Sequence, residues 1–450
     1  MQSNPAGIRM DDFSGAIIDM IVSRCSFEDL PNIRLAATRL SRPATRRLFG
    51  QVVLKPTEES ISQWKAIAQD DKIRQLPKIV AIWSYPDIDL RTYESDGDES
   101  MVKQDAFFDA LDDLKRFENA QSVNLLSTPD VCGSDYARSH WITLFEDPTY
   151  RKSTLVRLFG AIQARNDDSA SAIKDLTFRN LQNMPVPEVT MSETFRSVMQ
   201  SIEGLHNGFL EDWIHPISSR LKRLSLYDRT NWGILPGRFP AESLQLPELE
   251  DLSLGYYTIG QDNQLDWLFR CKHLKRLNLH NVQILSHAML VDQSIESWSV
   301  DTRPWQSIAN PDPRHGVRVG RGGGIRKFFK TNVQWATFYD RIANEMPHLT
   351  RITIAYGSSC EDDIQHDIQE RDNLGLSFDT KRYVAFWEGI LPNPWPEADE
   401  RSHHREDEPN GKIEWCRTEI NPHAEYLDED KEAYNRMVEV IQQRRSRTSE

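Results

Sequence analysis

The glycine-rich stretch at residues 320–325 is the strongest candidate for catalytic or cofactor chemistry. It reads Gly-Arg-Gly-Gly-Gly-Ile, and glycine-rich turns can hold a phosphate group with their backbone amides. A dinucleotide-binding fingerprint requires glycine where Ile325 stands, and a Walker loop requires Gly-Lys followed by serine or threonine, which is missing. We therefore interpret these residues as a flexible loop whose basic residues could attract an acidic partner.

Two pairs of histidine and cysteine residues could contribute ligands to a metal. His403 and His404 are adjacent in a stretch rich in charged residues, and Cys271 and His273 precede a predicted strand. A metal site needs three or four ligands at compatible spacings, and neither pair offers them. The sequence also lacks the Gly-x-Ser-x-Gly and His-Glu-x-x-His motifs of hydrolases and metalloproteases. We expect no catalytic residue, no metal and no cofactor, so the chain is not predicted to be an enzyme.

Arginines without acidic neighbours cluster at residues 34–49, which read RLAATRLSRPATRRLF. One hypothesis is a nucleic-acid-binding arm, because clustered arginines replace the counterions of a polyanion. Against it, the chain has a formal net charge of −14, and the apolar residues between the arginines keep helical spacing. We therefore predict that the arginines form the solvated face of small helices, and nucleic acid is not expected as a partner.

The composition is that of a globular protein, with 39% hydrophobic and 27% charged residues in a chain of 450. The five cysteines lie far apart without any Cys-x-x-Cys spacing, so we expect free thiols in a reducing compartment. No apolar run approaches the roughly 18 residues of a membrane helix, and the N-terminus lacks the pattern of a signal peptide. These features predict a soluble protein of the cytoplasm or nucleus that does not engage a membrane.

Three short helices are predicted near the N-terminus. Apolar residues at helical spacing between Phe13 and Cys25 place a stripe on one face of the first helix. Ser26, which precedes acidic residues, is expected to cap the second helix, and Ser41 and Pro43 are expected to begin the third. Because three helices in about forty residues bury little surface, such a unit needs support from a partner or from the rest of the chain.

A repeated pattern, Leu-x-x-Leu-x-Leu, occurs in the middle of the chain. Complete copies begin at Leu221, Leu249 and Leu274, spaced 28 and then 25 residues apart. Substituted copies begin at Leu76, Ala120, Ile173 and Leu349. The period matches leucine-rich repeats, in which each strand and its helical return bury their apolar residues against the next repeat. The pattern therefore predicts a stacked α/β repeat region with one continuous core.

These signals divide the chain into four parts. Residues 8–50 form the helical head, and residues 51–86 contain a linking strand and helix. Residues 87–396 form the repeat region, and residues 291–330 interrupt it with a stretch rich in proline, glycine and serine that we expect to be a long flexible insertion. Residues 397–450 form a polar tail that includes a terminal helix.

The helical head resembles an F-box, specifically that of fungal F-box proteins. The matching elements are Ile-Ile-Asp-Met-Ile at residues 17–21, Ser-x-Glu-Asp-Leu at 26–30, Ile-Arg-Leu at 33–35 and Arg-Leu-Ser-Arg-x-Ala-Thr-Arg-x-Leu-Phe at 39–49. The resemblance covers residues 10–70 well and the repeat region only generally. F-boxes usually open with Leu-Pro, whereas this chain has Phe13 and Ser14, which keep the apolar residue but lose the rigid one that starts the helix.

The resemblance implies a fold class and a function. The fold would be α/β, with a small N-terminal three-helix F-box followed by an irregular leucine-rich repeat solenoid. The chain would be the substrate-recognition subunit of an SCF-type cullin-RING E3 ubiquitin ligase, in which the F-box binds the Skp-type adaptor and through it a cullin. The repeats would bind a protein substrate of unknown identity. The implied adaptor contacts are Phe13, Ser14, Ile17, Ile18, Ile21, Leu30 and Leu35.

Two questions stay open at this point. Ile18 and Leu35 could equally be buried in the small core of the head itself, because such a unit has few apolar residues to spend on its own packing. The alternative function is a repeat-based protein-binding scaffold without ligase association, which the departure at Phe13 and Ser14 permits. Adaptor binding distinguishes the two functions.

Overall fold

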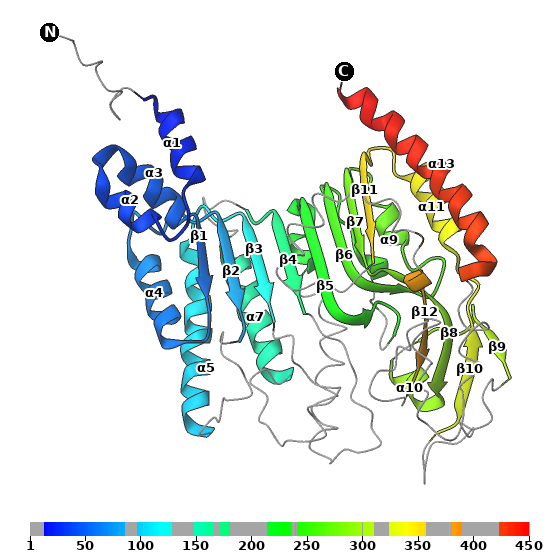
Figure 1. Cartoon of the computed structure of the whole chain (residues 1–450). Helices are drawn as coiled ribbons and strands as arrows, with labels where there is room; N and C mark the ends of the chain where they lie inside the picture. Colours follow the sequence, from blue (N-terminus) through cyan, green and yellow to red (C-terminus); the bar gives the residue numbers. More distant parts are fainter. Residues whose placement is uncertain are drawn as a thin grey trace, which may run out of the picture. The chain divides into compact units, whose positions relative to one another are not determined.

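The chain forms a mixed α/β protein in which most strand pairs are parallel (Figure 1). The computed structural model describes residues 13–85, 97–127, 148–165, 172–180, 214–235, 239, 241–298, 300–309, 324–356, 378, 380–388 and 423–449. Two compact units divide the chain. Unit 1 comprises Met1–Leu125 and Arg157–Ile173, and unit 2 comprises Leu126–Val156 and Lys174–Glu450.

The predicted helices of the head are confirmed as α1 (Gly15–Arg24), α2 (Leu30–Ala36) and α3 (Thr38–Leu48). Their ends differ from the prediction, because α3 begins at Thr38 and contains Pro43 in its interior. Ser26 does not cap α2. Its hydroxyl instead accepts a hydrogen bond from the Asp29 amide at 3.2 Å and so closes the turn before that helix.

The rest of unit 1 packs helices against short strands. Its elements are β1 (Gln51–Leu54), α4 (Glu58–Gln69), β2 (Ile79–Trp83), α5 (Gly97–Asp112), the 3-10 helix η3 (Asp113–Arg116), β3 (Ser122–Leu126) and the end of α7 (Pro148–Ala164). β1 pairs with β2 in parallel, and β3 lies next to β2. The buried Trp64 of α4 donates its indole N–H to the Ala110 carbonyl of α5 at 2.7 Å. This contact joins the predicted linking region to the start of the predicted repeat region, and both of its residues lie in unit 1.

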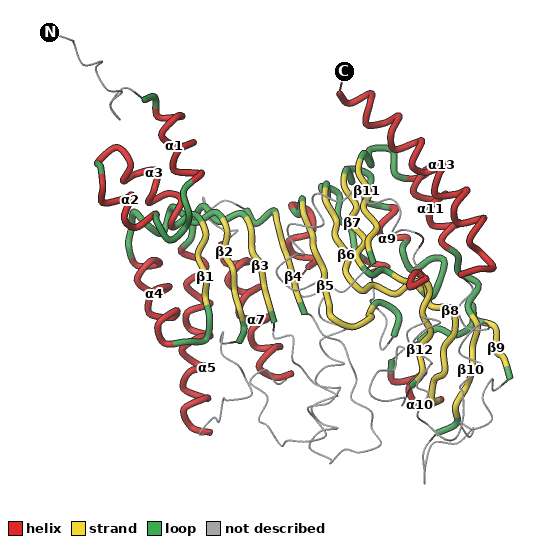
Figure 2. The backbone as a smooth tube through the Cα atoms, in the orientation of Figure 1, coloured by secondary structure: helices red, strands yellow, loops and turns green. Residues whose placement is uncertain are grey.

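Unit 2 contains a ladder of parallel strands that carries the repeated pattern (Figure 2). The strands, in their order across the sheet, are β4 (Asp175–Arg179), β5 (Arg223–Trp232), β6 (Asp251–Ile259), β7 (Arg276–His280) and β11 (Arg351–Ala355). Each copy of the pattern that begins between Ile173 and Leu349 has its second and third apolar positions on one of these strands. The two weaker copies, at Leu76 and Ala120, place theirs on β2 and β3. The predicted strands are therefore present, although those of the weaker copies belong to unit 1.

The register of this parallel ladder stacks equivalent apolar residues in rows. Leu224 pairs with Leu252, Leu252 pairs with Leu277, and Leu277 pairs with Ile352. The three leucines are at most 1% exposed. A fully buried leucine contributes roughly 1.5–3 kcal/mol relative to an exposed one, so the rows stabilise the ladder. Because side chains alternate along a strand, the residues next to these leucines along each strand lie on the other face of the sheet.

A second group of strands follows the ladder in unit 2. It consists of β8 (Gln283–Val291), β9 (Gln306–Ile308), β10 (Arg326–Lys330) and β12 (Tyr383–Trp387), with the short helix α10 (Asp292–Ser297). β12 is parallel to β8, whereas β10 is antiparallel to both β8 and β9. The prediction of a flexible insertion at residues 291–330 is wrong where the structure describes it, because α10, β9 and β10 lie within it. Phe328 and Phe329 are buried and anchor β10, and residues 310–323 lie outside the described part.

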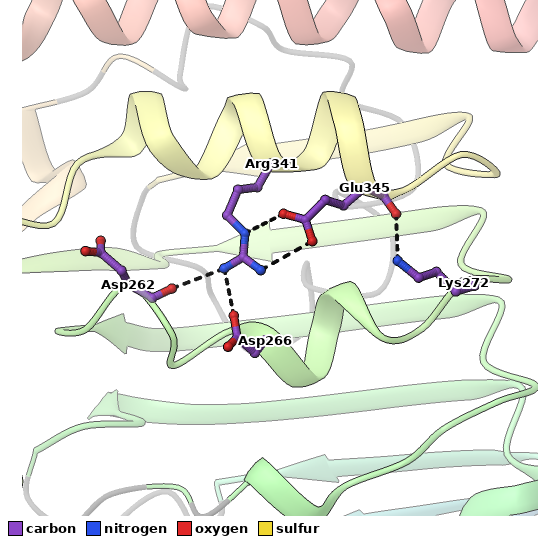
Figure 3. Close-up of polar contacts among 5 residues, drawn as sticks. All are labelled: Asp262, Asp266, Lys272, Arg341 and Glu345. Carbon is purple, nitrogen blue, oxygen red and sulfur yellow. Dashed lines mark hydrogen bonds and ion pairs between the residues drawn. The ribbon is translucent and has the colours of Figure 1, made fainter.

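Helices complete unit 2 (Figure 1). They are the 3-10 helices η7 (His215–Arg220), η8 (Ala241–Ser243) and η10 (Thr380–Arg382), with α9 (Asp266–Phe269), α11 (Trp335–Glu345) and α13 (His423–Ser449). Arg341 of α11 donates to the Asp266 carboxylate at 2.8 Å and to the Glu345 carboxylate at 2.7 Å, which joins α11 to α9 (Figure 3). Arg382 and Asp430 form a fully buried ion pair at 2.9 Å that holds the terminal helix α13. The predicted terminal helix is confirmed as α13, which ends at Ser449.

Candidate partner-binding surface

The candidate site residues lie on α1, on α2 and on the turn that begins α1. Ser14 is the N-cap of α1, and its hydroxyl accepts from the Ile17 amide at 3.4 Å. A serine cap satisfies an amide that the start of a helix leaves without a partner. The chain therefore begins α1 at Gly15 without the proline that an F-box usually has at this point.

The structure separates the predicted contact residues into two groups. Ile18 and Leu30 are 2% and 0% exposed and belong to the core cluster of the head, with Phe13 packed against it. Ile17 and Leu35 are 40% and 83% exposed. Ile18 is therefore buried in the core of the head itself, whereas Leu35 is not.

Two exposed apolar residues were not among the predicted contacts. Met20 is 59% exposed and Phe27 is 57% exposed. Met20 lies three positions after Ile17 and next to Ile21 on α1, a spacing that places all three on neighbouring parts of one helix surface. The helical period could have identified Met20, whereas Phe27 lies in a turn and has no such signal. We name these five exposed side chains the exposed apolar set: Ile17, Met20, Ile21, Phe27 and Leu35.

Arginines of α3 hold α1 in place. Arg39 donates to the Phe13 carbonyl at 2.8 Å, and Arg46 pairs with Asp19 at 2.7 Å. Arg47 donates to the Val22 carbonyl. These contacts give three of the clustered arginines a role within the head, as ties between α3 and the helix that carries most of the exposed apolar set.

The sequence motifs that suggested other chemistry do not assemble a site among the described residues. The Cys271 thiol is buried, which raises its pKa to about 12, and it donates to the Trp267 carbonyl at 3.5 Å. His273 stacks on His348 with ring centroids 5.9 Å apart. In the ranges that the structure describes, no group of three or more His, Cys, Asp or Glu residues is placed to hold a metal ion. His403, His404 and most of the glycine-rich stretch lie outside those ranges.

The parallel ladder also carries charged side chains at the starts of its strands. Glu250 precedes β6 and accepts hydrogen bonds from Lys275 at 2.7 Å and from Lys222 at 3.0 Å. The two ammonium groups lower the pKa of the Glu250 carboxyl to about 2. On the strands themselves, Arg223 donates to Asp175 through two nitrogens, at 2.7 and 2.5 Å. Most charges at this edge therefore neutralise one another.

On the face opposite the leucine rows, aromatic and polar side chains lie together. The Tyr227 ring passes over Gly255, where an added Cβ atom would lie 2.1 Å from the ring. The centroid of this ring is 6.2 Å from that of His280. Burial lowers the pKa of His280 and raises that of Tyr227. Neighbouring positions carry small polar groups, such as Ser253, which accepts from Asn278 at 3.0 Å.

The side chains of the head and of the ladder are of kinds that can contact a partner protein. The head presents apolar side chains, and the ladder presents alternating charges with hydroxyl and amide groups. No helix among the described residues has the length and apolar character needed to cross a membrane. No protein-family model matches the chain, and no curated protein matches its sequence.

Proposed function

We propose that the chain is the substrate-recognition subunit of an SCF-type cullin-RING E3 ubiquitin ligase. Its head binds a Skp-type adaptor, and the adaptor connects it to a cullin. The repeat region binds the protein to be ubiquitinated. Ubiquitin transfer belongs to other subunits, so this chain contributes binding and positioning instead of catalysis.

The exposed apolar set is the observation that carries the proposal. A small helical head has a core of few residues, yet it leaves Ile17 and Ile21, one helical turn apart, 40% and 38% exposed. Burial of one such side chain by a partner contributes up to about 1.5–3 kcal/mol. An amphipathic helix that presents such residues fits a groove or a facing helix of a partner, and the F-box resemblance supplies the adaptor as that partner.

The departure from Leu-Pro is compatible with adaptor binding. Phe13 keeps an apolar side chain at the first position and packs against the core cluster of the head. Ser14 replaces the rigid residue with a hydrogen-bonding cap, so α1 still begins at the next residue. Helix α1 thus forms without the proline and presents Ile17 and Ile21 as exposed side chains.

The direct test is capture of a purified Skp-type adaptor by the full chain. We expect the wild type to form a complex. An Ile17→Asp and Ile21→Asp double variant should bind the adaptor about tenfold more weakly or worse, because burying an unpaired charge at an interface is unfavourable. Val156→Asp on α7 is the matched control, since Val156 is 49% exposed and lies outside the head. Equal thermal unfolding of wild type and variants shows that the fold is intact.

A repeat-based scaffold without ligase association is the second candidate, and the absence of Leu-Pro at the start of the head favours it. It predicts that the wild-type chain does not capture the adaptor, although its repeat region still binds a target. Failure of the wild type to bind any Skp-type adaptor, with the head folded, would replace the ligase proposal by this one.

A further inference from the structure

The last strand of the parallel ladder, β11, has an open edge. It pairs with β7 along its whole length, and no other strand in the described residues pairs with it. The Arg351 amide donates to the Lys275 carbonyl at 3.0 Å, so Arg351 faces β7. Because successive residues of a strand direct their amides and carbonyls to opposite edges, those of Ile352 and Ile354 face the open edge.

The apolar core is also less covered at this end. Ile352 continues the row of Leu252 and Leu277, which are 0% exposed, but it is itself partly exposed. Repeat proteins usually close such an end with a polar capping element. Edge strands are also commonly protected by lysine, proline or a bulge. Residues 352–355 read Ile-Thr-Ile-Ala, which favours a strand and carries none of these residues.

Arg351, at the start of β11, forms no ion pair with an acid among the residues that the structure describes. Arg351 is exposed and lies opposite Arg276 in the register. Asp251 pairs with Arg276 at 3.5 Å, and the next acid along the row, Asp175, is taken by Arg223. Like charges on opposite positions of paired strands destabilise the sheet, so a negative group beside Arg351 is favoured.

The turns before β7 and β11 extend this basic region. His273 and His348 are exposed, and their rings stack nearly in parallel with an interplanar angle of 12°. Lys272 lies beside them and donates to the Glu345 carbonyl at 3.2 Å (Figure 3). The Glu345 carboxylate itself is bound by Arg341.

We propose that the open edge of β11 binds an extended acidic segment of a partner protein by strand addition. The backbone of the segment pairs with Ile352 and Ile354, and its carboxylates lie against Arg351 and the stacked histidines. Strand addition supplies affinity through main-chain hydrogen bonds, and the side chains beside the edge supply selectivity. The inference rests on the proposed function only in assigning this segment to the protein that is to be ubiquitinated.

The test selects peptides from a random-sequence phage library on the full chain and measures the affinity of enriched peptides by fluorescence anisotropy. We expect enrichment of aspartate and glutamate beside β-branched residues. Ile352→Pro removes one amide from the open edge and leaves the bonds to β7 in place. Arg351→Glu reverses the local charge. Each should weaken binding about tenfold or more, and a lysine-substituted peptide should regain affinity for Arg351→Glu.

The control variant is Lys327→Glu, which reverses an exposed charge on β10 and should leave peptide affinity unchanged. Adaptor capture by the same variants separates this inference from the proposed function, because adaptor binding depends on the head and not on β11. Three results would overturn the inference: no acidic enrichment, equal binding to both edge variants, or a dimer of the chain that Ile352→Pro converts to monomer. The last result would identify the open edge as a contact between two copies.

Discussion

The helical head and the parallel ladder differ in what happens to their apolar residues. At equivalent ladder positions, Leu252 and Leu277 are 0% exposed because each strand covers the next. In the head, Ile17 and Leu35 remain 40% and 83% exposed, because three short helices enclose only one small cluster. The parallel strands of the ladder thus complete their own core, whereas the head keeps apolar surface that a partner can cover.

The end of the ladder shares this property of the head. Ile352 on β11 has a neighbouring strand on one side and is partly exposed, unlike the leucines of the same row. Incomplete burial therefore marks the two places where we propose partners. In the head, a partner would contact exposed helix side chains. At β11, it would pair with the backbone at the edge of a strand.

The largest effect expected is from truncation in the ladder. Leu252→Ala should lower the free energy of unfolding by about 2–5 kcal/mol, because it opens a cavity in a closed row, whereas Ile17→Ala should change it by less than about 1 kcal/mol. Urea unfolding followed by circular dichroism measures both. Equal losses would contradict the contrast between head and ladder.

A smaller effect on stability is expected at Gly255, which the Tyr227 side chain covers. Gly255→Ala places a methyl group against the Tyr227 ring and should cost about 1–3 kcal/mol through overpacking. The control is Gly160→Ala on α7, where no atom lies within 4 Å of the added Cβ and helix propensity should raise stability by roughly 0.5–1 kcal/mol. Thermal unfolding distinguishes the two signs, and destabilisation by both variants would remove the assigned role of Tyr227.

The arginine contacts in the head should matter less for stability than for positioning. Arg39→Ala with Arg46→Ala should cost about 0–1 kcal/mol, because the Arg46–Asp19 pair is about half exposed. Hydrogen exchange of the α1 amides should nevertheless accelerate. Arg42→Ala, an exposed arginine on the same helix, is the matched control. If exchange in α1 is unchanged, these arginines do not hold the helix.

The smallest effect concerns pH and Glu250. Its pKa of about 2 in the folded chain is below the ordinary value of 4.5, so its two ion pairs add stability above pH 4.5 and lose it as the pH falls toward 2. The stability difference between wild type and Glu250→Gln should therefore shrink as the pH is lowered, and also as salt is added, because these groups are at least partly exposed. A difference that grows on acidification would have the wrong sign.

Local patterns predicted much of the fold. The Leu-x-x-Leu-x-Leu copies predicted strands because an apolar residue at alternate positions must face the core at each repeat. The copies from Ile173 to Leu349 accordingly lie in one register. The strands of the second group in unit 2 escaped prediction. β12 is buried at every position and lacks alternation, and β10 is a short apolar pair between basic residues.

The candidate site was predictable only in part. The sequence identified α1 and placed Ile17 and Ile21 on it, but it could not separate these residues from Ile18 and Leu30, which the head buries. The period of a helix defines which side chains share a face, but it does not define how many of them the neighbouring helices cover. Phe27 was missed for another reason, because it lies in a turn where no helical period applies.

The sequence by itself determined the three head helices, the spacing of the repeated strands and the presence of a terminal helix, because these depend on contacts between residues close in the chain. Only the tertiary structure decided which apolar residues remain exposed, that β11 is the last strand of the ladder among the described residues, and that Arg382 meets Asp430 in the core. These features depend on which segments, far apart in sequence, pack together and on the surface that their packing leaves uncovered.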